Sequence, residues 1–537
     1  MTLSERAKEI EATLHKRQLS TILLVVILGL GSLRLMLANI AQHPGHGDYA
    51  FYYTVAENIV DGKGFQIDYI WNYLSSPETI SHSSNDYWMP LTSVIISLPL
   101  FVFGKSLFVA LLPSIIAGLA LSVLTYFVSK VYSDSRLVAF CSSILVLVVP
   151  SLFNYSLLTD SAIFYALFVS SSLLCMIKGW TDHRFFLLSS ALAGLGHLTR
   201  QDGLLLLPVL LCMILLSRQQ HFRMKLVYAL LALGLYVALL SPLMVSNYRT
   251  FGALFPAGPS KTMFLTQYED LYSYSKELSL HSYLEWGLSN IIKSKARMAI
   301  SNTKTLFNFL GEFLSIFTLV GALDFIASSE KRRRWAMYLP PILFLGILFA
   351  FYTFVATFPS SAGGFMRSSM AVIPFLVVIA VDTINRTILS KTAVALSIFA
   401  VVALFSYQSI SSTKSIIYSN VYLGEQLATL KEIVTNDARD RKQKHEEIVI
   451  MTRNPWEVYY STRYKAIQIP NENLEIIYQV AQKYRANYLL LPAPREALKS
   501  LYVGEMSDDR FQFVASIPNS DMKLFRIRLE TGDADGP

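Results

Sequence analysis

Long apolar runs recur along most of this chain, and they constrain its fold more than any other feature. The first run extends from Leu19 to Ile40, directly after Lys16 and Arg17. It is long enough for a helix to cross a bilayer, which takes about 20 apolar residues. No convincing small-residue cleavage site follows, so the run is expected to be an uncleaved signal anchor. Ten further candidate spans are residues 106–130, 136–153, 161–179, 185–199, 202–217, 224–246, 305–327, 336–357, 368–387 and 391–410. The pattern predicts a polytopic α-helical membrane protein with about eleven transmembrane helices.

The composition agrees with a membrane protein. The 537 residues are 53% hydrophobic and only 16% charged, which is too apolar for a soluble protein of this size. The net charge of +8 does not indicate a nucleic-acid partner, because the excess Lys and Arg residues lie between apolar runs. All three cysteines, Cys141, Cys175 and Cys212, fall inside apolar runs, so they indicate neither a disulfide framework nor a metal site.

One further apolar stretch, DYWMPLTSVIISLPLFVFG, contains two prolines and suits an interfacial or re-entrant helix better than a span. If it does not cross the membrane, the connections rich in Lys and Arg, such as residues 331–334, all lie on the side of the N-terminus. The opposite connections are then poor in positive charge, which is the positive-inside pattern. This pattern predicts a cytoplasmic N-terminus. It makes residues 42–105 one large extracytoplasmic loop and residues 247–304 a second one.

The composition changes after residue 414. Four short segments, EEIVIMT, YKAIQIP, ANYLLLP and MKLFRIR, have the character of strands, and NENLEIIYQVAQKYR has the amphipathic pattern of a helix. We therefore expect a transmembrane domain at residues 1–414 and a small α/β domain, with a mixed or parallel sheet, at residues 415–537. Because the N-terminus is expected in the cytoplasm and the number of expected spans is odd, this second domain is expected on the extracytoplasmic side.

Two carboxylates stand at the outer ends of predicted spans. Asp48 follows the first span in the aromatic segment HGDYAFYY, and Asp160 precedes a later span in LLTDSAIFY. Ionisable groups at membrane depth are costly and are usually retained for function. A positioned carboxylate can take the proton of an acceptor hydroxyl, which is otherwise a poor nucleophile. The simpler alternatives are a helix N-cap for Asp160 and a solvated loop residue for Asp48. Glu57 fits a structural role near the end of a helix.

Basic residues at the same boundary could bind a phosphate leaving group. The candidates are Arg200, Arg249, Lys261 and Arg367. Arg367 is favoured, because glycines lie beside it and a span follows it. Each of the four could instead extend its side chain to the membrane interface. The candidates for a substrate pocket in the first loop are Tyr52, His82, Asn85 and Asp86. The last three would also suit a turn before the interfacial helix.

Five segments of the chain resemble those of the GT-C membrane glycosyltransferases, both in their order along the chain and in the side of the membrane on which they are expected. The resemblance is to the glycosyltransferase family 39-like branch of protein O-mannosyltransferases and lipid A aminoarabinose transferases, over residues 15 to 410. It is carried by HGDYAFYY, YWMPLTSVIISLPLFVFG, LLTDSAIFY, LTRQDGLLLLP and GFMRSSMAVIPFL. The resemblance implies inverting transfer of a sugar from a polyprenyl phosphate to an acceptor at the outer face. It implies Asp48 as general base and Asp160 as a contact to acceptor or sugar. It also implies Arg367 and Arg200 as contacts to the lipid phosphate.

The chain departs from the family pattern at several points. Tyr49 follows Asp48 where protein mannosyltransferases have an Asp-Glu pair, and Gln201 stands where proline is common. No MIR-type β-trefoil insert is visible. The acceptor, which could be a lipid, a glycan or a protein, therefore stays open.

No cofactor is firmly indicated. Asp48, Asp160 and scattered histidines could hold a divalent metal ion, but neither outer acidic loop contains a DxD pair. The predicted partners are a polyprenyl-phosphate-linked sugar, an unidentified acceptor and the lipid bilayer, with no nucleic acid. Two alternatives remain open. A transporter or flippase for a lipid-linked sugar should show internal repeats, and a non-catalytic membrane scaffold would leave the outer charged residues unexplained.

Overall fold

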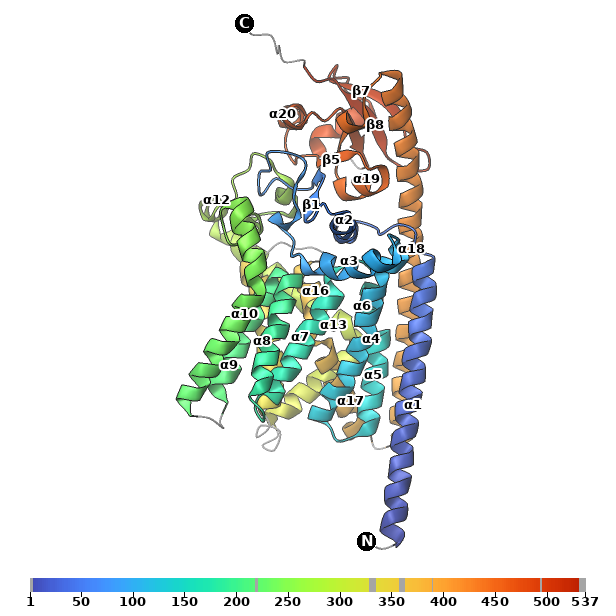
Figure 1. The fold of residues 1–537 in the computed structure, drawn as a ribbon, viewed down its shortest axis with the longest axis vertical. Coiled ribbons are helices and arrows are strands. Elements are labelled where there is room, and N and C mark those ends of the chain that lie inside the picture. The colour runs from blue at the N-terminus through green and yellow to red at the C-terminus, as the bar shows by residue number, and fades with distance from the viewer. Residues whose placement is uncertain are drawn as a thin grey trace.

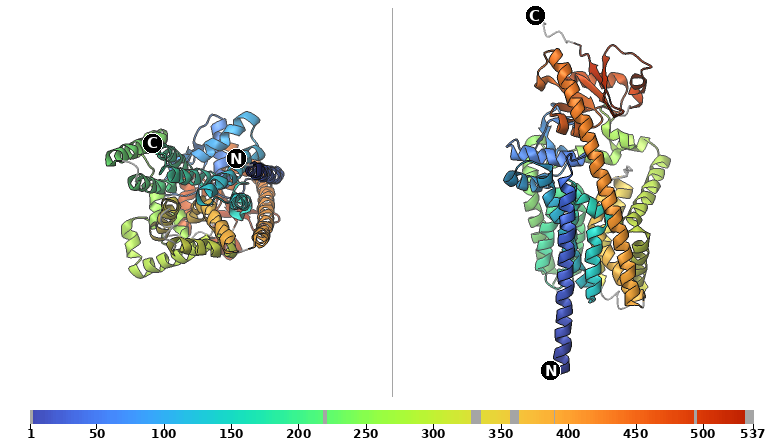
Figure 2. Two further views of the ribbon diagram at one scale, coloured as in Figure 1. Left: turned by 90° about the horizontal axis from the view of Figure 1, so that it is seen from below. Right: turned by 90° about the vertical axis from the view of Figure 1, so that its right-hand side faces the viewer.

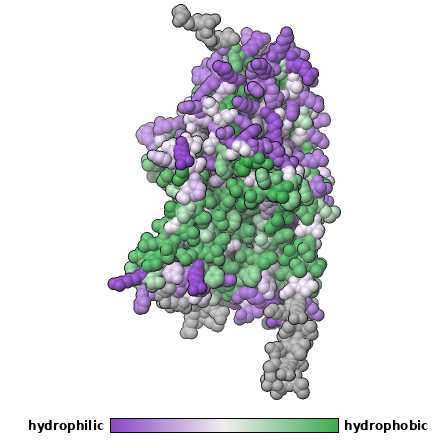
Figure 3. All heavy atoms as spheres, viewed as in Figure 1, coloured by the Kyte–Doolittle hydropathy of each residue, from purple (hydrophilic) through white to green (hydrophobic). Residues whose placement is uncertain are grey.

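The computed structural model describes residues 3–217, 221–327, 335–356, 363–388, 390–492 and 495–530. Long helices form a bundle, and a small α/β domain covers one end of it (Figure 1). Helix α1 begins at the opposite end of the bundle (Figures 1 and 2). On the face seen in Figure 3, apolar side chains form a broad band across the middle of the molecule, between two hydrophilic ends. A bundle that spans a bilayer presents such a band to the lipid.

Eight helices of the described part of the chain are long and apolar enough to cross a membrane. They are α1 (Leu3–Asn39), α4 (Leu107–Tyr132), α7 (Ser161–Lys178), α10 (Phe222–Phe251), α13 (Leu288–Ala327), α15 (Trp335–Ala350) with η5 (Phe351–Val355), α16 (Gly364–Ser369) with α17 (Ile373–Thr387), and α18 (Lys391–Asp440). The other expected spans coincide with shorter helices, namely α5 (Arg136–Val148) with α6 (Pro150–Tyr155), α8 (Arg184–Thr199) and α9 (Leu206–Leu216). The predicted polytopic helical architecture is thus confirmed.

Side chains from distant helices donate hydrogen bonds to the backbone carbonyls at the break between α5 and α6. Pro150 lacks an amide hydrogen and starts a new helix, so the last carbonyls of α5 have no intrahelical partner. The Leu147 carbonyl accepts a bond of 2.7 Å from Arg34 Nη2 of α1, and the Val148 carbonyl accepts one of 2.8 Å from Ser409 Oγ of α18. Backbone groups inside a bilayer must find such partners within the protein. The buried Arg34 therefore joins α1 to α5.

The first long loop, which was expected at residues 42–105, contains helices and strands. It contains α2 (Asp48–Val60), the short strands β1 (Gln66–Ile67), β2 (Tyr69–Ile70) and β3 (His82–Ser83), and α3 (Leu91–Phe103). Helix α3 is built on the proline-bearing stretch and lies across the end of the bundle (Figure 1). It exposes four large apolar side chains, Leu98, Phe101, Val102 and Phe103. This orientation is what an interfacial helix requires, and its contact with lipid stays a prediction.

The C-terminal domain is built on a six-stranded mixed sheet with the order β2-β5-β4-β6-β8-β7. Strands β4 (Val449–Thr452), β5 (Lys465–Gln468), β6 (Tyr488–Leu491) and β8 (Lys523–Ile527) lie in the four segments expected from the sequence, and α20 (Leu474–Tyr484) lies in the expected helix. Strand β4 is parallel to β5 and β6, whereas β8 is antiparallel to β6. The edge strand β7 (Phe511–Ser516) was not expected.

Two features tie this domain to the transmembrane part. Helix α18 continues without interruption past residue 414 to Asp440, so the expected domain boundary falls inside a helix. It is the long orange helix that reaches from the bundle into the C-terminal domain (Figures 1 and 2). In addition, strand β2 of the first long loop pairs in parallel with β5. The six-stranded sheet therefore contains residues from both sides of the expected boundary.

The second long loop, which was expected at residues 247–304, also contacts the C-terminal domain. Helices α10 and α13 extend into this region and leave four short elements between them, α11 (Gly258–Lys261), η3 (Thr262–Phe264), η4 (Tyr268–Tyr272) and α12 (Leu280–Glu285). Glu269 pairs with Arg453 of the C-terminal domain at 3.2 Å. Glu472 of the C-terminal domain accepts a bond of 3.0 Å from the amide of Ser275. The C-terminal domain thus contacts both long loops.

Candidate active site

Arg367 brings together the two carboxylates that the sequence indicated. It lies on the short helix α16, whereas Asp48 is the first residue of α2 and Asp160 is the N-cap residue of α7. Arg367 Nη1 donates to Asp48 Oδ2, and Nη2 lies 3.6 Å from Asp160 Oδ2. The remaining Nε donates to the Tyr155 hydroxyl at 3.2 Å. The three charged side chains are at most 14% exposed, so they form an enclosed ion-pair cluster.

The two oxygens of Asp160 have different surroundings. Oδ1 accepts a hydrogen bond of 2.7 Å from the Ala162 amide, which is the N-cap bond that begins α7. Oδ2 accepts no hydrogen bond from the described residues and lies at ion-pair distance from Arg367. Burial raises the pKa of Asp160 to about 6, although the Ala162 amide and Arg200 act in the opposite direction. The N-cap role therefore uses one oxygen and leaves the other directed at the cluster.

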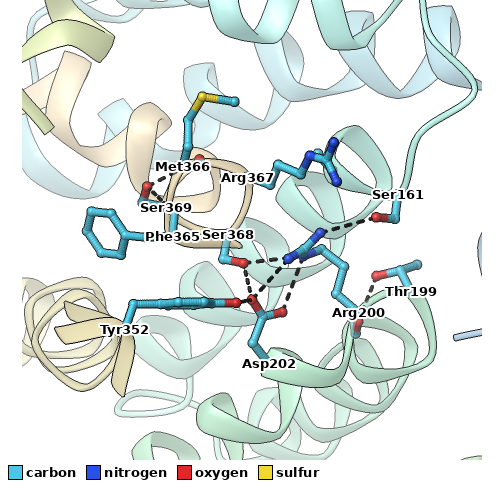
Figure 4. A network of polar contacts seen from close by, with 12 residues as sticks. Ser161, Thr199, Arg200, Asp202, Tyr352, Phe365, Met366, Arg367, Ser368 and Ser369 are labelled. Atoms are coloured by element: carbon cyan, nitrogen blue, oxygen red, sulfur yellow. Dashed lines mark hydrogen bonds and ion pairs between the residues drawn. The ribbon is translucent and has the colours of Figure 1, made fainter. Parts of the chain in front are cut away.

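A second network surrounds Arg200 (Figure 4). Arg200 Nε lies 3.3 Å from Asp202 Oδ1 and donates to Ser368 Oγ at 3.3 Å. Its Nη1 donates to Ser161 Oγ at 3.5 Å. Asp202 Oδ2 in turn accepts from the Tyr352 hydroxyl at 2.5 Å and from the Ser368 hydroxyl. Ser161 and Ser368 directly follow the acid and the arginine of the first cluster in the chain, so the two networks adjoin.

Two glycines allow the close packing of these elements. The turn HLTRQDG joins α8 to η2 (Gln201–Leu205) and holds Arg200 in an extended conformation, with φ −150° and ψ 137°. A Cβ atom on Gly203 would lie 2.5 Å from the backbone nitrogen of His197. A Cβ atom on Gly364, at the start of α16, would lie 2.4 Å from the Tyr352 hydroxyl oxygen. Glycine at both positions lets the Arg200 turn and α16 approach their neighbours.

Of two other predicted site residues, Tyr52 contacts a residue of the second network and Arg249 does not. Tyr52 of α2 is 1% exposed, its hydroxyl contacts Ser161, and its ring lies beside Trp88 with the centroids 6.3 Å apart. It therefore belongs to the wall of the site. Arg249 is exposed on the last turn of α10, and the structure does not bring it into either network.

The polar cluster of the first loop forms a structured turn. His82 Nε2 lies 3.4 Å from Asp86 Oδ2, and both Asn85 and Asp86 are buried. Lys261 donates to the Leu74 carbonyl at 2.7 Å, which joins the second long loop to the first. These contacts show the turn that the sequence allowed as an alternative, and a sugar-binding role for the cluster stays a prediction.

Five further residues of the two networks received no role from the sequence. They are Tyr155, Ser161, Asp202, Tyr352 and Ser368. The sequence did contain a signal for Asp202, because a carboxylate two residues after Arg200 at the end of a span suggests a counter-ion for that arginine. Tyr352 and Ser368 had none, because hydroxyl side chains are common in membrane helices and only the fold brings these two together.

A metal site is not evident in the described part of the chain. No group of three or more His, Cys, Asp or Glu side chains there has the arrangement needed to hold a metal ion. The two acids nearest the cluster centre, Asp48 and Asp160, are both engaged by the guanidinium of Arg367. In the described residues, the guanidinium of Arg367 thus lies where these two acids meet.

The structure is similar to solved membrane proteins over most of its length. ArnT from Cupriavidus metallidurans, bound to undecaprenyl phosphate, matches with a TM-score of 0.61 at 12% identity, over 96% of this chain and 99% of that one. The oligosaccharyltransferase of Archaeoglobus fulgidus in its apo form matches with a TM-score of 0.54 at 13% identity, over 87% and 69%. The chain has the GT-C fold. At such low identities the similarity establishes the fold alone.

Sequence comparison adds one observation to the GT-C fold. A family model described as dolichyl-phosphate-mannose-protein mannosyltransferase matches residues 85–245. This segment contains Asp160 and Arg200 but neither Asp48 nor Arg367. No curated protein is significantly similar in sequence. The family match and the GT-C fold together support a membrane glycosyltransferase, and the resemblance inferred from the sequence is confirmed.

Proposed function

We propose that this protein moves a sugar from a polyprenyl-phosphate donor to an acceptor at the outer face of the membrane, with inversion at the anomeric carbon. The observation that carries the proposal is the convergence of Asp48, Asp160 and Arg367 where the helix bundle meets the outer domain. These residues come from three distant parts of the chain and form one enclosed cluster. A protein of the same fold, ArnT, is bound to undecaprenyl phosphate in its crystal structure, which supports a lipid-phosphate donor.

Asp48 is the proposed general base. The acceptor oxygen forms a bond to the anomeric carbon on one face while the bond from that carbon to the phosphate oxygen breaks on the other. The acceptor hydroxyl gives its proton to the Asp48 carboxylate, and polyprenyl phosphate leaves. General-base assistance of this kind contributes roughly 10²–10⁴ in rate. A neighbouring guanidinium favours the charged form of a carboxylate, so Arg367 keeps Asp48 ready to accept a proton.

Arg367 is the proposed ligand of the donor phosphate. Three of its five N–H groups face protein partners, so the other two remain to bind a phosphate. The contact with Asp160, at 3.6 Å, is the longest of the three, so a phosphate can also replace it while Asp48 stays paired. Arg200 is the second candidate, because its contacts of 3.3 to 3.5 Å are long for hydrogen bonds.

Asp160 is proposed to bind a hydroxyl of the sugar or the acceptor. Its Oδ2 is buried, accepts no hydrogen bond from the described residues and lies in the same cluster as Asp48. A buried acceptor atom without a partner favours the binding of a donor group from a substrate. Tyr52 contacts Ser161 beside this acid and packs against Trp88, whose partly exposed ring is the proposed aromatic surface for a sugar.

The alternative functions explain fewer of these contacts. A transporter of a lipid-linked sugar should carry its ionisable residues within broken helices near mid-membrane. Here Asp48 and Asp160 stand at the first residue of α2 and the N-cap of α7, at the ends of helices. A non-catalytic scaffold gives no reason for burying two acids around one arginine, which is costly unless the group has a use.

The proposal can be tested with the purified full-length protein in lipid nanodiscs. The protein is incubated with radiolabelled polyprenyl-phosphate sugars and an envelope extract, and the labelled products are identified. We expect the label to move from the lipid to an acceptor, with release of polyprenyl phosphate. A protein that moved labelled lipid across proteoliposome membranes and left the sugar attached would instead be a transporter.

A further inference from the structure

Helix α2, which begins with Asp48, lacks a capping side chain of its own. Its N-cap residue is Gly47, with φ 56° and ψ −116°, and no side-chain hydrogen bond caps the first turn. The first amides of a helix have no intrahelical partners, and a capping side chain typically contributes about 1 kcal/mol. The N-terminus of α2 therefore depends on groups from elsewhere in the molecule.

The carboxylate of Glu457 lies at this end of α2. Glu457 belongs to α19 (Pro455–Thr462) in the C-terminal domain, and its side chain is only 2% exposed. Glu457 Oε1 lies 2.5 Å from Nδ1 of His46, a residue 411 positions away in the sequence. Burial raises the pKa of Glu457, while His46 and the amide of Gly47 act in the opposite direction. The carboxylate thus binds the turn that precedes Asp48, at the positive end of the α2 dipole.

Helix α19 also holds the other end of α2. Arg463, the residue that ends α19, donates from Nη2 to Glu57 Oε2 at 2.9 Å. Between the two ends, the rings of Tyr53 and Tyr460 meet edge to face with their centroids 5.6 Å apart. The contacts at both ends and in the middle fix the position of α2 relative to the C-terminal domain. Glu57 is thus a contact between α2 and the C-terminal domain, and its structural role stays a prediction.

We propose that Glu457 is a positioning residue for the transfer reaction. By holding His46 in the turn directly before α2, it fixes the first turn of α2 so that Asp48 meets Arg367 and the acceptor. The inference rests on the proposed function of Asp48. It gives the C-terminal domain a part in the chemistry, because a displacement of about 1 Å at a reacting group can cost on the order of 10²-fold in rate.

Two substitutions and one control test this role by kinetics. Glu457→Ala should lower kcat by about 10- to 100-fold while the KM for the donor changes by less than about threefold, because the phosphate contact is intact. Glu457→Gln should keep most of kcat, since its side-chain oxygen still accepts hydrogen bonds. Glu475→Ala is the control. It removes a 62% exposed glutamate of the same domain, which pairs with Arg510 far from α2, and should leave kcat unchanged.

A readout that is independent of activity distinguishes positioning from general damage. Amide hydrogen exchange of residues 47–54 should become faster in Glu457→Ala and stay unchanged in Glu475→Ala. In an Asp48→Asn background, Glu457→Ala should lower kcat by less than about threefold further, because its effect acts through Asp48.

The proposal is overturned by any of three results. These are a kcat of Glu457→Ala within about twofold of the wild type, unchanged exchange of residues 47–54, or a full additional loss in the Asp48→Asn background. A normal turnover of Asp48→Asn alone would instead refute the assignment of Asp48 as the base, on which this inference rests. The exchange measurement would still decide whether Glu457 orders α2.

Discussion

Replacing Arg367 with alanine should damage both the stability of the protein and its affinity for the donor. Arg367 is the ionic partner of two carboxylates, of which Asp160 is 0% exposed and Asp48 is 13% exposed. Removing one partner of a buried ion pair typically costs about 3–5 kcal/mol, because the remaining charge is left unpaired. Arg367→Ala should therefore lower the apparent melting temperature in detergent strongly.

The loss of stability should be relieved by a second substitution, Asp160→Asn. Asparagine keeps the side-chain oxygen that accepts from the Ala162 amide, so α7 remains capped, and it removes the buried charge. The melting temperature of the double variant should lie above that of Arg367→Ala. The melting temperature of Arg367→Lys should lie between those of the wild type and Arg367→Ala. Lysine keeps the positive charge but lacks the planar guanidinium, which can bind two partners at once.

The loss of donor affinity should persist in the double variant. A hydrogen bond to a charged group contributes about 1.5–3 kcal/mol, so loss of one phosphate contact should raise the donor KM by roughly 10- to 100-fold. Thermal unfolding by intrinsic fluorescence and transfer rates at varied donor concentration measure the two effects separately. A double variant as unstable as the sum of the single variants would refute the ion pair. A normal donor KM would refute the phosphate role.

Two other predictions concern the turn after α8 and the topology. Gly203→Ala should reduce both turnover and melting temperature. The new Cβ would lie 2.5 Å from the His197 nitrogen, so the backbone that positions Arg200 would have to move. Normal values in both assays would show that the turn can adapt. A reporter that is active only in the cytoplasm should be silent when fused after Arg528, because the basic residues 331–334 predict a cytoplasmic connection followed by three further spans. Reporter activity there would place the cluster on the inner face and contradict the outer-face site.

The helical architecture could be predicted because apolar runs near the thickness of a bilayer have few other uses. The first run, Leu19–Ile40, corresponds to the apolar part of α1, and the strand-like segments after residue 440 became β4, β5, β6 and β8. Strand β2 was missed, because its two residues, Tyr69 and Ile70, carry no periodic signal and pair only through tertiary contacts. The continuity of α18 was missed for a related reason. Its composition changes from apolar to charged while its helical geometry does not.

The central residues of the site could be found because charge is costly at the ends of apolar runs. Asp48, Asp160 and Arg367 each stand out by that criterion, and the structure brings them together. Tyr352 could not be found in this way, because a tyrosine in a membrane helix has many ordinary roles. Glu457 could not be found either, since a glutamate in a soluble domain is common and only the fold reveals that it is buried at the start of α2.

The most direct test of the account is the turnover of Asp48→Asn with a polyprenyl-phosphate sugar and the identified acceptor. Asparagine keeps the shape of the side chain and removes the base, so kcat should fall by roughly 10²–10⁴ while donor binding, measured separately, stays largely intact. Exchange of residues 47–54 at the wild-type rate would confirm that α2 keeps its structure. A kcat near that of the wild type in a well-folded protein would contradict the assignment of Asp48 as the base, and Asp160 would become the leading candidate.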